Sequence, residues 1–145
     1  MTRSKIMAYS LAGILVVIGI VYCLVANSEY EDSVEMSDMG IMGEANEKQF
    51  ETSFFVSAAI VNFILAGLVI KSNRSVIPYY ASAGVSAILI VVYIASRTVG
   101  VPVVGVEYYI GRLDLISKIL QAIAIVLSGI AIHNLRKSKT LKEFA

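Results

Sequence analysis

Three methionines at equal spacing are the residues of this chain whose type and pattern point most directly to chemistry. Met36, Met39 and Met42 lie three apart in a segment that is rich in carboxylates. Soft thioether sulfurs select Cu(I), whereas carboxylates suit harder cations. The pattern therefore predicts a Cu(I) contact. The competing interpretation, which we favour, is that the methionines are flexible apolar contacts for another protein.

A second chemically interesting group lies in the stretch from residue 97 to residue 118, between two apolar runs. Its charged residues are Arg97, Glu107, Arg112, Asp114 and Lys118. Asp114 precedes Lys118 by four residues, which on a helix is the favourable order for an ion pair. The start of a helix also favours the negative charge of Asp114, and the end of a helix favours the positive charge of Arg97. We expect a structural polar cluster that pins two helices together at one membrane surface.

Sequence signatures of self-sufficient catalysis are missing from the chain. It has no G-x-x-x-x-G-K-[ST], no H-E-x-x-H and no C-x-x-C motif. Its one histidine, His133, cannot build a His-rich copper site alone, and the lone Cys23 excludes a disulfide framework. The sequence therefore predicts a protein that is not an enzyme, with no catalytic residues and no intrinsic cofactor.

The elements that must position these groups are four long apolar runs. The chain has 145 residues, of which 57% are hydrophobic and 16% are charged, whereas soluble domains carry about 25% charged residues. Each run is close to the ~20 residues that a helix needs to cross the hydrocarbon of a bilayer. The runs predict helices over residues of about 6–26, 53–71, 76–97 and 111–134. We expect an all-α protein, with residues 1–145 forming a single four-helix membrane domain.

The distribution of basic residues predicts the orientation of this bundle. Most of the 12 lysines and arginines lie before the first run, between the second and third, or after the fourth. Cytoplasmic segments are enriched in Lys and Arg, so both termini are expected in the cytoplasm. The acidic segment 27–49 and the connection 98–110 are then expected as extracytoplasmic loops. We expect a multi-pass protein of the cell (plasma) membrane that binds no nucleic acid, since its net charge is only +1.

Polar side chains recur on the faces of three predicted helices. Asn62 lies between small residues, Ser82 and Ser86 share one face, and Gln121 lies on a polar face of the last helix. Small residues let membrane helices approach closely, and polar ones hydrogen bond across the contact. Helix packing is the expected role of these residues. The alternative is a polar path in a small transporter or channel component, although a proton path would need an ionisable residue near the bilayer centre.

The junction between the third and fourth predicted helices carries a resemblance to a known group of proteins. The third helix ends in RTVGVP, and the fourth opens with IGRLDLISK. This pattern resembles small four-helix membrane proteins of ammonia-oxidising archaea, over about the last third of the chain. Some of these are accessory subunits of archaeal ammonia monooxygenase, a copper membrane enzyme.

The resemblance implies a non-catalytic structural subunit of a larger membrane complex. Its partners would be other membrane subunits and the lipid bilayer, and copper would belong to the complex rather than to this chain. No catalytic residue is carried over with the resemblance. A further alternative is copper delivery through the methionine-containing acidic segment.

Overall fold

The four predicted helices are present in the computed structural model, which describes residues 3–144 without the side chains of residues 142 and 143. They are α1 (Arg3–Asp38), α2 (Met42–Lys71), α3 (Ile77–Thr98) and α4 (Arg112–Glu143). The described part of the chain contains no strand. All four helices are long and apolar enough to cross a membrane. The prediction of an all-α, four-helix architecture is confirmed.

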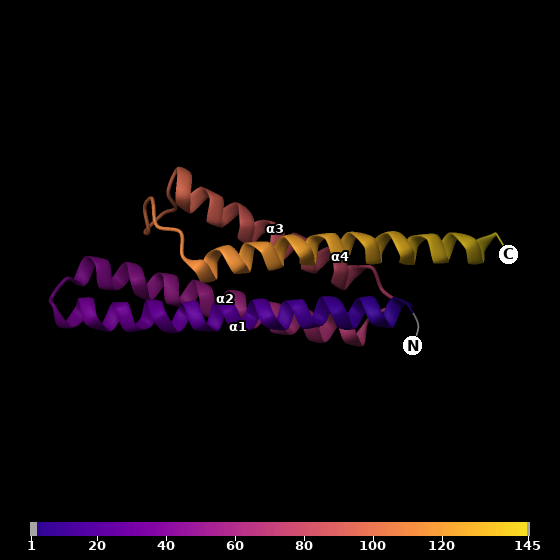
Figure 1. Ribbon diagram of the computed structural model, residues 1–145, viewed down its shortest axis with the longest axis horizontal. Helices are drawn as coiled ribbons and strands as arrows, with labels where there is room; N and C mark the ends of the chain where they lie inside the picture. Colours follow the sequence, from indigo (N-terminus) through magenta and orange to yellow (C-terminus); the bar gives the residue numbers. More distant parts are fainter. Residues whose placement is uncertain (1–2, 145) are drawn as a thin grey trace.

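The helices pair as two hairpins, and one side of the bundle is much less closely packed than the others. α1 packs along the full length of α2, and α3 packs on α4. α4 also contacts α1, whereas α2 and α3 have only a few contacts, and α1–α3 and α2–α4 have none among the described residues. Figure 1 shows α1 and α2 side by side, with one end of α3 diverging from the rest of the bundle. Both termini lie at the opposite end of the molecule from the turn between α1 and α2.

The core follows from helical periodicity and from small residues at the helix contacts. Leu11, Leu15, Ile18 and Tyr22 recur every three or four residues on α1, so they lie on one face, and all four are buried. Gly19 shares this buried face, and a Cβ atom there would lie 2.6 Å from Cε1 of Phe63 on α2. The missing side chain is therefore what allows α1 and α2 to approach so closely.

Three helices, α1, α2 and α4, are longer than a membrane span requires, and the first two of them correct one prediction. α1 has 36 residues and is about 54 Å long at 1.5 Å per residue, whereas the hydrocarbon is ~30 Å thick. The acidic segment 27–49 is therefore not a loop. It continues α1 to Asp38 and begins α2 at Met42. The segment folds this way because Glu, Met, Ala, Gln and Lys are good helix formers, so its polarity indicates exposure to water rather than irregular structure.

The reversal between α1 and α2 is correspondingly short. Gly40 has a φ of +79°, in the left-handed region that glycine adopts at the ends of helices. Its N–H donates to the carbonyl of Ser37 at 3.0 Å, and the N–H of Ile41 donates to the carbonyl of Met36 at 2.9 Å. These two bonds form a Schellman motif, in which an apolar contact between Ile41 and Met36 is typical. The backbone carbonyl of Met36 therefore closes the end of α1.

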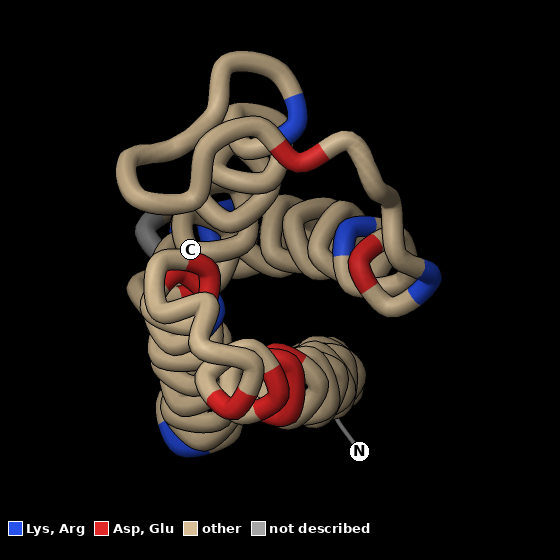
Figure 2. Tube along the Cα trace, turned by 90° about the vertical axis from the view of Figure 1, so that its left-hand side faces the viewer, with Lys and Arg blue, Asp and Glu red and all other residues tan. Residues whose placement is uncertain are grey.

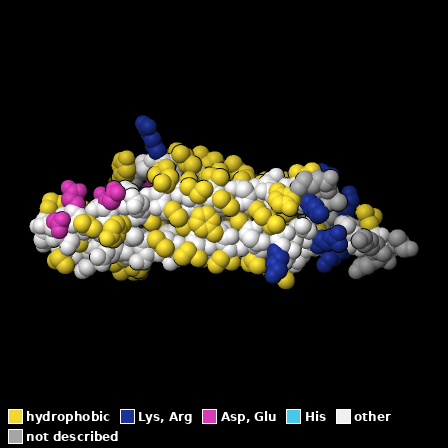
Figure 3. Space-filling model, turned by 90° about the horizontal axis from the view of Figure 1, so that it is seen from below, with side chains coloured by type: hydrophobic (Ala, Val, Ile, Leu, Met, Phe, Trp, Pro, Cys, Tyr) yellow, Lys and Arg dark blue, Asp and Glu magenta, His cyan; other side chains and the backbone are white. Residues whose placement is uncertain are grey.

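Charge is segregated along the long axis of the molecule. Figure 3 shows acidic side chains at one end and most of the basic side chains at the other. The basic end is the one where both termini lie. The structure thus brings together the basic segments that are separate in the sequence.

Candidate functional site

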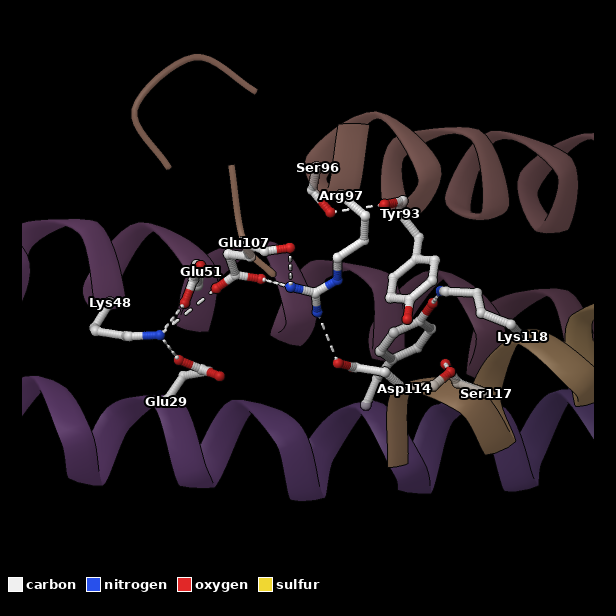
Figure 4. Close-up of polar contacts among 11 residues, drawn as sticks. Glu29, Lys48, Glu51, Tyr93, Ser96, Arg97, Glu107, Asp114, Ser117 and Lys118 are labelled. Atoms are coloured by element: carbon white, nitrogen blue, oxygen red, sulfur yellow. Dashed lines mark hydrogen bonds and ion pairs between the residues drawn. The ribbon is translucent and has the colours of Figure 1, made fainter. Parts of the chain in front are cut away.

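Lys48 of α2 is the centre of an ion-pair group at the acidic end of the bundle. Its Nζ lies 2.8 Å from Oε2 of Glu29 on α1 and 2.9 Å from Oε2 of Glu51 on α2. Oε1 of Glu107, in the connection between α3 and α4, is 3.9 Å away. These contacts join three parts of the chain that are distant in sequence (Figure 4). Lys48 is therefore the residue that fastens the α1–α2 hairpin to the connection.

Arg97 forms a second centre beside the first. Its Nη1 lies 2.6 Å from Oε2 of Glu107 and also donates to the carbonyl oxygen of Glu107 at 3.2 Å. Its Nη2 lies 3.0 Å from Oδ2 of Asp114. Glu107 contacts both Lys48 and Arg97, so the two centres form one network. The structure thus brings together Arg97, Glu107 and Asp114, three members of the polar cluster predicted from the sequence.

The connection of residues 99–111 is shaped to deliver Glu107 to this network. Gly100 has a φ of +79°, and a Cβ atom there would lie 2.8 Å from the carbonyl carbon of Gly105. Val101 and Gly105 form an isolated antiparallel bridge, and the N–H of Glu107 donates to the carbonyl of Ser96 at 3.0 Å. The connection is therefore a compact fold over the end of α3.

Lys118 does not form the expected ion pair with Asp114. Its Nζ instead donates to the hydroxyl of Tyr22 on α1 at 2.9 Å and to Oε1 of Gln121 at 3.2 Å. The reason is that Asp114 turns its Oδ2 to Arg97, while the lysine side chain reaches across to α1. Arg112 also lies outside the network, because it is exposed and has no ion pair within the described residues.

A cleft of about 870 Å³ opens at this end of the bundle. All four helices and the connection line it. Its apolar part includes Phe54 of α2 and Leu89 of α3. Its charged lining consists of four basic residues, Lys48, Arg97, Arg112 and Lys118, and five acidic ones, Glu29, Asp32, Glu51, Glu107 and Asp114. Figure 2, viewed along the bundle, shows acidic and basic residues distributed around this end of the molecule. The cleft therefore combines charge and an apolar wall in one space.

The four predicted helix-packing residues are all buried, but most of them do not bond between helices. Asn62 Nδ2 donates to the carbonyl of Ala58, and Ser82 Oγ donates to the carbonyl of Pro78, both at 2.8 Å. These bonds stay within one helix, because a buried polar side chain can use the carbonyl of the preceding turn. Gln121 alone bonds across helices, from Nε2 to the hydroxyl of Tyr22 at 2.5 Å.

Apart from Glu29 Oε2, which is in an ion pair with Lys48, three buried side-chain oxygen atoms have no hydrogen-bond partner within the described residues. They are Asn62 Oδ1, Ser86 Oγ and Ser128 Oγ. Each belongs to a side chain that is almost fully buried. A buried polar group without a partner is costly, so these positions call for a reason beyond the packing of this single chain.

The methionine segment provides no enclosed site for copper. The side chains of Met39 and Met42, beside the turn at Gly40, are 59% and 57% exposed. The described residues contain no group of three or more His, Cys, Asp and Glu that could hold a metal ion. Met36 lies in the last turn of α1, where its carbonyl accepts the bond from the N–H of Ile41. The Cu(I) contact stays a prediction of the sequence, and no chemical step is assigned to it.

Sequence reasoning missed four members of the site, which are Tyr22, Glu29, Lys48 and Glu51. One signal was available, because Lys48 is the only basic residue among the carboxylates of the acidic segment. Tyr22 had no such signal, since it is an isolated polar group in an apolar run. Its pairing with Lys118 spans 96 positions of the sequence.

Comparisons of the chain with protein-family models, curated proteins and solved structures found no significant match.

Proposed function

We propose that this chain is a non-catalytic structural subunit of a larger membrane complex. The observation that carries the proposal is an outward-facing glycine on each of the four helices, namely Gly13, Gly67, Gly84 and Gly129. A Cβ atom added at any of them would meet no described atom within 4 Å. These glycines therefore serve no close contact inside the chain.

Exposed glycines in a membrane helix call for an explanation outside the chain itself. Glycine destabilises a helix interior by roughly 0.5–1 kcal/mol relative to alanine. Association of membrane helices relies on close packing, and small residues mark the contact surfaces. The surface of α3 shows the pattern best, because Ala81, Gly84 and Ala87 are all exposed at a spacing of three residues. We infer that a helix of another subunit packs on this surface.

The polar network supports the same role. The ion pairs of Lys48 and Arg97 join the two helical hairpins and the connection. A unit held in this way presents fixed outer surfaces to neighbours. The resemblance at the junction of α3 and α4 makes archaeal ammonia monooxygenase one candidate complex. We also propose that both termini face the cytoplasm of a cell membrane, because the basic residues lie at their end.

The test is assembly in native membranes. Membranes containing tagged chain are solubilised mildly and examined by native gel electrophoresis with mass spectrometry. We expect the chain to migrate with larger membrane subunits. Gly84→Leu should abolish the comigration, because a leucine on α3 blocks the close approach of a partner helix. Val91→Leu is the matched control, since Val91 is exposed on the same helix and already bears a branched side chain.

A second candidate function is a small transporter or channel component. The unpartnered oxygens of Asn62, Ser86 and Ser128 favour it, because buried polar atoms of this kind are commonly bonded to water. The same gel separates the two candidates. Migration as a homo-oligomer without other subunits, unchanged by Gly84→Leu, would replace the first proposal with the second.

A further inference from the structure

Lys118 is a cation of the cleft that forms no ion pair with a carboxylate of the described residues. Within the described residues, no Asp or Glu oxygen lies within the 4.0 Å of an ion pair from its Nζ. Its two hydrogen bonds go to the neutral groups of Tyr22 and Gln121. An ammonium group has three donors, so one donor remains for another acceptor. A cation in a membrane span is expensive unless such a partner is present.

A second donor of the same cleft is also unused. Nε of Arg97 is buried and has no hydrogen-bond partner in the part of the chain that the structure describes. Arg97 Cζ and Lys118 Nζ lie 5.1 and 5.0 Å from the centre of the same Tyr93 ring. Figure 4 shows both side chains beside this tyrosine. The two positive groups therefore contact the same aromatic ring, and each has a donor to spare.

The neighbouring carboxylates do not occupy these donors. The ion pairs of the cleft are all formed by Lys48 or by the terminal nitrogens of Arg97. A group with several acceptor oxygens and a negative charge can accept from both remaining donors and also offset their positive charge. A phosphate fits this description, because Arg and Lys both bind it through charge-assisted hydrogen bonds.

The rest of the cleft is suited to an apolar chain. Phe54 and Phe55 of α2 and Leu89 and Val92 of α3 line it. Its volume of about 870 Å³ lies within the ~300–1,000 Å³ of small-molecule sites, which are mainly apolar with a few polar groups that orient the ligand. A polar head beside Tyr93 would thus be joined to a tail that lies against α2 and α3.

We propose that this cleft binds one amphiphile with an anionic phosphate head and an apolar chain. The head accepts hydrogen bonds from Lys118 Nζ and Arg97 Nε, and the chain lies against the apolar wall. A membrane phospholipid and a free alkyl phosphate share this chemistry. The proposal does not depend on a partner subunit.

The test uses the purified full chain in an uncharged maltoside detergent. Binding of n-dodecyl phosphate is measured by native mass spectrometry and by the shift in the thermal unfolding midpoint. Inorganic phosphate tests whether binding requires the alkyl tail of the ligand. Dodecyltrimethylammonium tests whether binding requires the negative charge of the head group. We expect only dodecyl phosphate to bind well. Phospholipid retained through purification would identify the membrane as the source, and its absence would identify a soluble alkyl phosphate.

Two variants assign the binding to this cleft. Lys118→Gln should weaken dodecyl phosphate binding by about tenfold or more, because it removes a charged hydrogen-bond donor. Lys139→Gln, which removes the same charge from an exposed site on α4, should have no effect. Val92→Trp should also abolish binding by filling the apolar part, without touching a charge. Its result keeps the proposal testable if Lys118→Gln does not fold.

Three results would overturn the proposal. The first is no binding of dodecyl phosphate to the wild-type chain. The second is equal binding of dodecyltrimethylammonium or inorganic phosphate. The third is unchanged binding in folded Lys118→Gln or in folded Val92→Trp.

Discussion

Two arginines at similar positions have different roles in this protein. Arg97 and Arg112 both lie at helix ends beside the connection. The side chain of Arg97 is 15% exposed and holds two carboxylates, whereas Arg112 is exposed and holds none that the structure describes. Burial and geometry, rather than residue type, decide which arginine stabilises the fold, because an exposed charge gains little from a neighbour.

This difference gives a prediction at the scale of one side chain. Arg97→Met should lower the free energy of unfolding by about 2 kcal/mol. The value lies between the ~3–5 kcal/mol of breaking a buried pair and the ~0–1 kcal/mol of an exposed one, because Glu107 and Asp114 remain 32% and 20% exposed. Thermal unfolding in detergent, followed by circular dichroism, measures the effect.

Arg112→Met is the matched control, and it should leave the unfolding midpoint unchanged. Asp114→Asn should cost less when Arg97 is already methionine, since the pair no longer exists to be broken. Equal destabilisation by the two arginine variants would contradict the assignment of Arg97 as a centre of the network.

At the scale of an element, the connection 99–111 depends on its backbone conformation. Gly100 and Val103 have φ values of +79° and +82°, a region that glycine adopts freely and a β-branched residue does not. Gly100 suits its position, whereas Val103 is strained. The connection therefore contains one residue that the fold requires and one that it tolerates.

Substitution at these two positions should act in opposite directions. Gly100→Ala should destabilise the protein by about 1–3 kcal/mol, because it adds both backbone strain and a contact with the carbonyl of Gly105. Val103→Gly should raise stability or leave it unchanged, because it relieves the strain of an exposed side chain. Unfolding midpoints in detergent compare the two. Equal stability of Gly100→Ala and the wild type would show that the connection folds differently.

At the scale of the whole molecule, the long helices and the separation of charge predict how the bundle lies in a membrane. Ser37 and Ser138 are both exposed, one beside the turn of α1 and α2 and the other near the end of α4. In a Cys23→Ser background, Ser37→Cys should react with a membrane-impermeant thiol reagent in intact cells, and Ser138→Cys should not. Ser138→Cys should react once the cells are opened. Labelling in the reverse order would invert the proposed orientation.

The sequence by itself determined the class of the protein and the positions of its main helices. Apolar runs of the right length predict membrane helices because lipid leaves the backbone no partner outside its own helix. The cluster of Arg97, Glu107 and Asp114 was also predictable, since Arg97 and Asp114 lie at the two ends of the short connection that contains Glu107. The acidic segment was misjudged, although the helix-forming residues that explain its structure are visible in the sequence.

Only the tertiary structure decided the partners of Lys118 and Lys48. Local spacing favoured Asp114 for Lys118, but Arg97 holds that carboxylate and the lysine bonds to Tyr22 instead. Lys48 likewise meets Glu107 only because two hairpins meet at one end of the bundle. Periodicity shows which face of a helix is buried but does not set the height and rotation of one helix against another. Those depend on packing contacts such as the one between Gly19 and Phe63.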